Sequence, residues 1–244
     1  MDRMIYLSMS GAKATMQRQE LISHNLANVS TVGFRAEMQA FRAVPVRGDG
    51  ATTRAYALET TTGYNDQAGV IQTTGRALDV AMKGNAWLAV QGNDGTEAYT
   101  RNGQLDINAE GLLMTMNGLT VLGDGGPINV PQGQEVAIAA DGTVSAKPPG
   151  TAGRPTPIGR LKLVTPEEKL TRGADGLFRG GDGELPADPN ARVAEGALEG
   201  SNVSAVEAMV SMISASRQFE RQMKLIQTAE RQEQTAQKLL SANG

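Results

Sequence analysis

Residues that break helices are confined to the middle of this 244-residue chain. All ten prolines lie between Pro45 and Pro189, and only three of the 29 glycines fall within residues 1–42 and 201–244. Proline removes a helical hydrogen bond and glycine costs backbone entropy, so both interrupt helices and mark turns. The distribution therefore predicts an α+β chain with a long helix at each end and a turn-rich centre.

The C-terminal segment has the stronger helix signal. Ser201 or Ser204 can act as the N-cap, and Glu207 stands three residues after Ser204, as in a capping box. Two rows with heptad spacing follow, and they contain Met212, Phe219, Ile226 and Leu240, and Met209, Ser216 and Met223. This pattern is typical of a coiled-coil stripe. A helix of about 37 residues would be ~55 Å long, and its apolar stripe needs a partner.

The N-terminal segment supplies a second amphipathic stripe. Its apolar residues follow helical spacing and include Ile5, Met9, Ala12, Met16 and Leu26. They predict a helix from Asp2 to Ala27 that ends at the turn-forming run 28–33. Residues 1–42 and 198–244 are therefore predicted to form one discontinuous assembly domain with a coiled-coil-like core layer. Because each stripe buries little without neighbours, we expect both ends to be mobile in a monomer and to fold on assembly.

The centre of the chain has the signals of β structure. Alternating apolar residues begin at Leu78 and Val80 and recur to Leu161 and Val164, separated by Asn-Gly, Asp-Gly and Gly-Gly turns. Short strands at this spacing are typical of an antiparallel sheet. Residues 76–197 are therefore predicted to be a β-rich outer domain. Residues 43–75 are rich in Thr and Gly with little periodicity, and we expect an extended connector there.

The residues needed for most catalytic and metal sites are missing or scattered. The chain has no cysteine, and His24 is its only histidine. A Ser-His-Asp triad or a zinc site would depend on that single imidazole. A β-domain hydrolase with helical extensions would need paired carboxylates in a cleft, whereas the acidic residues are dispersed among turns. No glycine-rich nucleotide motif occurs, and we expect a non-enzyme without cofactor, metal site or small-molecule substrate.

Charge and hydropathy argue against two further classes of partner. The net charge is −3, which gives no general attraction to nucleic acid or to an anionic membrane. The apolar runs are far shorter than the ~20 residues that span a bilayer. The first twenty residues contain five charged side chains and no continuous apolar region of a signal peptide. We therefore expect no nucleic-acid binding, no membrane insertion and no cleaved signal.

Three separated motifs carry a resemblance to a known family. The run SHNLANVSTVGFR at 23–35 resembles the N-terminal signature of flagellar rod and hook proteins. The runs LDVAMKGNAWL at 78–88 and YTRNG at 99–103 are similar to the start of that family's β domain. LEGSNV at 198–203, followed by EAM at 207–209, resembles its C-terminal signature. The sequence departs from the family at Asn85, Ala86 and Trp87, where relatives usually have glycine and phenylalanines.

The resemblance implies a structural subunit of the bacterial flagellar basal body. Such a subunit would polymerise through its terminal helices in the periplasmic rod and transmit torque from motor to hook. Its implied partners are copies of itself, other rod proteins and the flagellar type III export apparatus. The chain length and the opening residues MDRMIY at 1–6 favour a proximal over a distal rod protein. The distal rod subunit and a secreted β-domain binding module stay as alternatives.

The residues expected to mediate assembly come from both terminal segments. They combine the apolar stripes with the turn residues of the N-terminal motif. In the N-terminal segment they are Ile5, Met9, Met16, Asn25, Leu26, Asn28, Gly33 and Phe34, and in the C-terminal segment they are Met209, Met212, Phe219, Met223, Ile226 and Leu240.

Overall fold

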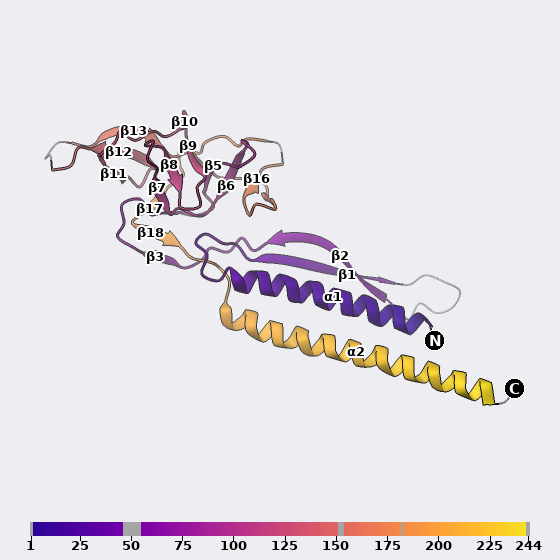
Figure 1. Ribbon diagram of the computed structural model, residues 1–244. Helices are drawn as coiled ribbons and strands as arrows, with labels where there is room; N and C mark the ends of the chain where they lie inside the picture. The colour runs from indigo at the N-terminus through magenta and orange to yellow at the C-terminus, as the bar shows by residue number, and fades with distance from the viewer. Residues whose placement is uncertain (1, 46–54, 151–153, 182, 243–244) are drawn as a thin grey trace. The chain divides into compact units, whose positions relative to one another are not determined.

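The computed structural model describes residues 2–45, 55–150, 154–181 and 183–242 (Figure 1). The chain divides into two compact units. Unit 1 comprises Met1–Val29, Ala36–Asn65 and Val203–Gly244, and unit 2 comprises Ser30–Arg35 and Asp66–Asn202. The terminal helices and the antiparallel β-rich centre agree with the predicted α+β class.

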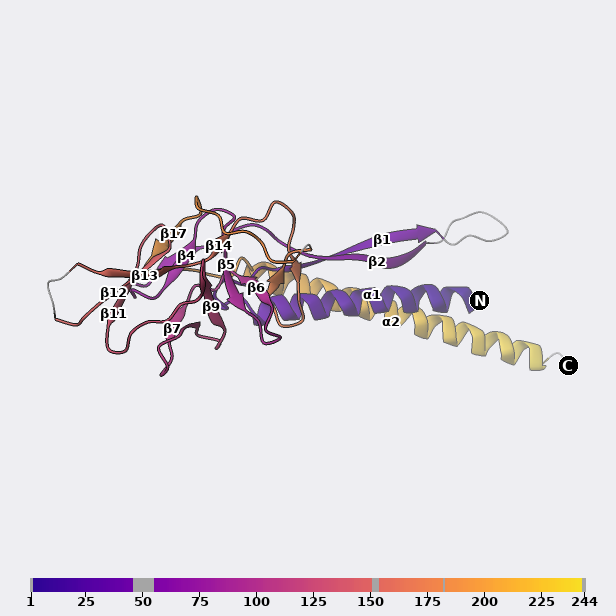
Figure 2. The same cartoon turned by 90° about the horizontal axis from the view of Figure 1, so that it is seen from above.

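Unit 1 contains two helices and a two-stranded ribbon. Helix α1 (Asp2–Ala27) packs against helix α2 (Ala205–Ala242) and also against strands β1 (Glu37–Pro45) and β2 (Ala55–Tyr64). The views in Figures 1 and 2 show the β1–β2 ribbon running along α1. The bounds of α1 match the predicted helix, because its apolar spacing, the absence of proline and the turn after Ala27 define it locally.

Polar side chains form hydrogen bonds with the backbone at the start of α2 and at the end of α1. The backbone N–H of Glu207 donates to Ser204 Oγ at 3.4 Å, and that of Ala208 donates to the Ser204 carbonyl at 2.9 Å. Ser204 therefore caps α2, as the sequence predicts. At the end of α1, the His24 carbonyl accepts from the Asn28 backbone N–H at 3.3 Å and from Asn28 Nδ2 at 2.9 Å, so both donors come from the residue that follows the helix.

Residues 43–75 differ from the extended connector that their composition suggests. Residues 46–54 lie outside the described part of the structure, and most of the described residues of the segment lie in β1, in β2 and in β3 (Ile71–Thr73). Strand β1 pairs with β2 over their full lengths, with a register shift between Ala40 and Phe41. The run of threonines in β2 has high strand propensity. Strand β2 also packs against α1, a contact between distant parts of the chain that the sequence does not reveal by alternation.

Unit 2 is built from short antiparallel strands. One sheet has the order β15-β16-β6-β5-β9-β8-β7, with β10 on β9 and β14 on β5. Its strands are β5 (Trp87–Gln91), β6 (Glu97–Thr100), β7 (Leu105–Ile107), β8 (Leu113–Thr115), β9 (Thr120–Gly123), β10 (Gly126–Pro127), β14 (Leu163–Val164), β15 (Thr171–Arg172) and β16 (Phe178–Arg179). Every strand pairing that the structure describes is antiparallel, which confirms the prediction for the centre of the chain.

Three smaller sheets complete unit 2. Strands β11 (Glu135–Ile138), β12 (Thr143–Lys147) and β13 (Thr156–Arg160) form one of them. Strand β17 (Val193–Glu195) pairs with β4 (Val80–Met82), and β18 (Ala197–Glu199) pairs with β3. The core gathers around β4 and β5, where Val80, Leu88 and Val90 are fully buried. Burial on both faces explains why these two strands read as continuous apolar runs.

Candidate functional site

The predicted assembly residues of the helices separate into two groups. Met212, Phe219 and Ile226 are half-buried on α2, and Ile5 and Leu26 are half-buried on α1. The second group is exposed and consists of Met9 (55%), Met16 (54%), Met209 (53%) and Met223 (38%). The side chain of Leu240 lies outside the described part of the structure. The two methionines of the second heptad row predicted on α2 are therefore exposed within a single chain, whereas Ser216 of that row is half-buried.

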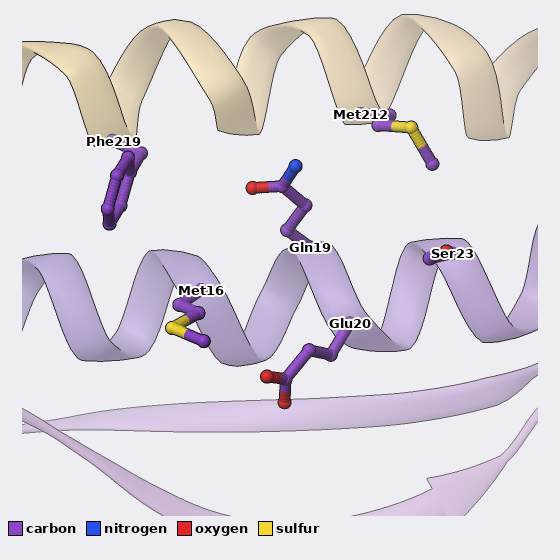
Figure 3. A pocket seen from close by; sticks show the side chains of 6 residues that line it. All are labelled: Met16, Gln19, Glu20, Ser23, Met212 and Phe219. Atoms are coloured by element: carbon purple, nitrogen blue, oxygen red, sulfur yellow. The ribbon is translucent and has the colours of Figure 1, made fainter.

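A groove between α1 and α2 joins three of these residues. Its volume is about 570 Å³, and it is lined by Met16, Gln19, Glu20 and Ser23 of α1 and by Met212 and Phe219 of α2. Figure 3 shows Met212 and Phe219 projecting from α2 toward α1, and Gln19 projecting from α1 toward α2. The groove presents apolar side chains that the two helices do not cover completely.

The first turns of α2 carry an apolar face that the sequence analysis missed. Val206, Val210 and Ile213 are 72%, 62% and 54% exposed, and Met209 lies beside them. At about 100° per residue these four positions span roughly 100° of the helix surface. Their spacing of three, four and seven residues is present in the sequence, but of the four only Met209 belongs to a predicted heptad row.

The four predicted residues of the N-terminal motif have two different structural roles. Asn25 and Asn28 belong to unit 1. The Asn25 side chain donates to the Glu37 carbonyl and accepts from the Glu37 N–H, both at 2.9 Å, so it fixes the start of β1 on α1. Gly33 and Phe34 belong to unit 2, where both are buried.

The most distinctive feature of unit 2 is a buried ion cluster, which we call the Glu199 cluster: Arg35, Arg101 and Glu199. Their side chains are at most 4% exposed. Arg35 Nη2 lies 2.8 Å from Glu199 Oε1, and Arg101 Nη2 and Nε lie 2.5 and 2.8 Å from Glu199 Oε2. Sequence reasoning did not identify these residues as a site, although each lies in one of the three motifs.

Backbone groups add further hydrogen bonds to the cluster, although the buried Arg35 Nε has no partner among the described residues. The Gly69 N–H donates to Glu199 Oε1 at 3.0 Å, and Arg101 donates to the carbonyls of Gly84 (3.1 Å), Met82 (3.2 Å) and Ala86. Burial lowers the pKa of the Arg101 guanidinium, the Glu199 carboxylate opposes this shift, and the like charge of Arg35 adds to it. Arginine nevertheless stays charged at neutral pH, so the carbonyl dipoles stabilise the second buried cation.

A row of aromatic and cationic side chains adjoins the cluster. The Arg172 guanidinium lies 4.7 Å from the centroid of the Phe34 ring and 5.8 Å from that of Phe178. The Phe178 and Trp87 ring centroids are 4.6 Å apart. The Arg101 guanidinium lies 5.7 Å from the centroid of the Trp87 ring, so the row ends at a member of the Glu199 cluster. Cation–π attraction is strongest where water is excluded, as it is here.

The described residues lack the features of two further classes of site. Among them, no three His, Cys, Asp or Glu side chains gather in a way that could hold a metal ion. Within the same ranges, neither α1 nor α2 is long and apolar enough to cross a membrane.

The chain matches three protein-family models. Residues 5–35 match the flagella basal body rod protein family, residues 81–146 match the D1 domain of flagellar hook protein FlgE/F/G, and residues 194–239 match the C-terminal family of flagellar basal body rod FlgEFG proteins. It is 46% identical to flagellar basal-body rod protein FlgF of Salmonella typhimurium strain LT2, over 99% of both chains. The chain belongs to the flagellar basal-body rod protein family. FlgF of Escherichia coli K12 is also 46% identical over 99% of both chains, and FlgG of Agrobacterium fabrum is 32% identical over 93% of this chain and 95% of its own.

The three matches place the Glu199 cluster within the rod-protein architecture. The N-terminal match ends at Arg35, the D1 match includes Arg101, and the C-terminal match includes Glu199. Each matched region of this rod protein therefore contributes one charged side chain to a single buried site. The matching families describe rod and hook proteins rather than enzymes.

Proposed function

We propose that this chain is a non-enzymatic structural subunit of the proximal rod of the bacterial flagellar basal body, which polymerises through α1 and α2 and transmits torque from motor to hook. The observation that carries the proposal is the exposed apolar surface on both helices. Tyr6, Met9 and Met16 on α1, and Val206, Val210 and Ile213 on α2, are each more than half exposed. Apolar residues repeated along a helix face mark an interaction surface.

The spacing of the less exposed residues on α2 supports a coiled-coil-like inner layer. These residues follow alternating steps of four and three, and they are Ala208, Met212, Ala215, Phe219, Gln222, Ile226 and Ala229. That is the repeat with which helices pack side by side. One seam would then face α1 of the same chain and the exposed faces would meet neighbouring subunits, as a heterologous, open polymer requires.

The names of the relatives support the choice within the family. The FlgF proteins of Salmonella typhimurium and Escherichia coli match at 46% identity, whereas the FlgG protein of Agrobacterium fabrum matches at 32%. This favours the proximal-rod role over the distal one. In that role, its partners would be copies of itself and other rod proteins. It would be located in the periplasmic part of the basal body, and it would be exported by the flagellar type III export apparatus.

The exposed face of α2 gives the direct test. We expect the double substitution Val210→Glu and Ile213→Glu to weaken subunit association by at least about 100-fold, because two carboxylates would be buried without partners. Incorporation into isolated basal bodies and swimming motility would be measured in cells that produce the variant instead of the native chain. Gln218→Glu with Gln227→Glu is the matched control, since both glutamines are exposed on α2. Incorporation equal to the control would contradict the proposal.

Limited proteolysis of the monomer tests the thin packing of unit 1. Among the α2 side chains that the structure describes, Ala215 is the buried hydrophobic residue. We therefore expect protease to remove both terminal segments well before it cuts the β-rich core of unit 2, and circular dichroism to show the matching loss of helix. Helical, protease-resistant ends in a verified monomer would indicate a self-contained domain instead.

A further inference from the structure

The segment Ser30–Arg35 is held in unit 2 although residues 36–65 separate it from the rest of that unit. Its Gly33 N–H donates to the Glu199 carbonyl at 2.7 Å, and the Phe34 carbonyl accepts from the Asn202 N–H at 3.3 Å. The Arg35 guanidinium pairs with Glu199 and donates to the Gln67 carbonyl. The segment therefore binds residues from two distant parts of the chain at once.

We propose that unit 2 contains a docking site for a glycine–aromatic–arginine segment, filled by Gly33, Phe34 and Arg35 of the same chain, and that filling it orders the C-terminal segment 199–202. Residues 199–202 would then become ordered only when the segment 33–35 is bound in the site. This inference concerns unit 2 alone and does not depend on the proposed assembly role.

Three features of the site match the three residues of the segment. At Gly33 the backbone has φ of +68°, and a Cβ atom would stand 2.3 Å from the Arg101 carbonyl carbon, so the position accepts glycine only. Phe34 lies under the Arg172 guanidinium at 4.7 Å. The two terminal nitrogens of Arg35 reach two different acceptors, and the planar guanidinium holds these donors apart in a geometry that the single nitrogen of a lysine ammonium does not reproduce.

The segment 33–35 is coupled to residues 67–69 and 199–202 because they share hydrogen-bonding groups. Glu199 Oε1 accepts from both Arg35 and the Gly69 N–H, and the Glu199 carbonyl accepts from Gly33. The Gln67 carbonyl accepts from Arg35 and also from Asn202 Nδ2, the latter at 2.8 Å. Withdrawal of the segment would remove hydrogen bonds from residues 67–69 and from 199–202 in the same step.

Hydrogen exchange in the full chain tests the coupling. The substitution Arg35→Met keeps the apolar stem of the side chain and removes its charge. In this variant we expect the Gly69 and Asn202 amides to exchange at least about tenfold faster, which corresponds to a decrease of roughly 1.4 kcal/mol in the free energy of opening. The Ala89 amide, which donates to the Lys162 carbonyl at 3.0 Å in the core, should keep its rate. Arg35→Lys should give an intermediate acceleration.

A matched control removes an arginine elsewhere in unit 2. Arg179 pairs with Asp94 and Asp175 at the surface, and Arg179→Met should leave the Gly69 and Asn202 rates unchanged. If Arg35→Met does not fold, Phe34→Leu provides the same readout with a milder change. Unchanged exchange at Asn202, or equal acceleration at Asn202 and Ala89, would overturn the proposal, because the segment would then be ordinary core packing.

Discussion

Glu199→Gln is expected to lower the free energy of unfolding of unit 2 by about 3–5 kcal/mol, the range for breaking a buried ion pair from one side. The substitution leaves the buried guanidinium groups of Arg35 and Arg101 without their shared anion. Glutamine keeps one acceptor oxygen, but its NH₂ group is a donor and would meet the donors of one of the two arginines.

Urea unfolding followed by tryptophan fluorescence measures this loss. Trp87 is the single tryptophan of the chain, is 2% exposed and lies next to Arg101, so its emission reports on the folding of unit 2. The matched control is Glu195→Gln on strand β17, where the side chain is exposed. We expect it to change stability by less than about 0.5 kcal/mol. A similarly small loss for Glu199→Gln would show that the cluster contributes little.

Gly33→Ala is expected to destabilise unit 2 by roughly 2–5 kcal/mol. Two costs add: about 1–2 kcal/mol for a side chain in the left-handed backbone region, and about 1–3 kcal/mol for forcing an atom into a packed site. The new Cβ would lie 2.3 Å from the Arg101 carbonyl carbon and 2.4 Å from the Asn102 nitrogen. Both are backbone atoms, so a side-chain rotation cannot relieve the collision.

Gly75→Ala separates the two costs. Gly75 has a φ of +73°, close to the +68° of Gly33, but a Cβ at Gly75 would meet no atom within 4 Å. It should therefore lose only the conformational part, about 1–2 kcal/mol. Thermal or urea unfolding of both variants gives the difference, which is the contribution of the close approach to Arg101. Equal losses in the two variants would mean that the segment moves away from Arg101 at little cost.

Local rules in the sequence were sufficient for the helices and for the class of the central part. The N-cap at Ser204, the run without proline or glycine after it, and the turn after Ala27 are each read from neighbouring residues, and the structure places the helix ends within two or three residues of the prediction. The alternation and Asn/Asp-Gly turns of the centre similarly indicate antiparallel strands, because a hairpin is a local event.

The strand pairing of residues 43–75 and the direction in which each helix face points were not determined locally. The threonine-rich β2 lacks alternation, and its pairing with β1 depends on support from α1. Met209 and Met223 belong to a valid heptad row, yet the groove beside α1 is lined by the adjacent row that contains Met212 and Phe219. A heptad pattern specifies a seam, but it does not specify which of two neighbouring rows an intrachain partner covers.

The sequence by itself therefore determined the two terminal helices, the antiparallel class of the centre and, through its three motifs, membership of the rod family. Only the tertiary structure decided that those motifs meet. Arg101 and Glu199 are 98 residues apart, and Arg35 reaches them across residues assigned to the other unit. Charged residues are usually solvated, so each one alone predicts a surface position. Their burial together is stable because the fold brings opposite charges and backbone acceptors within hydrogen-bonding distance.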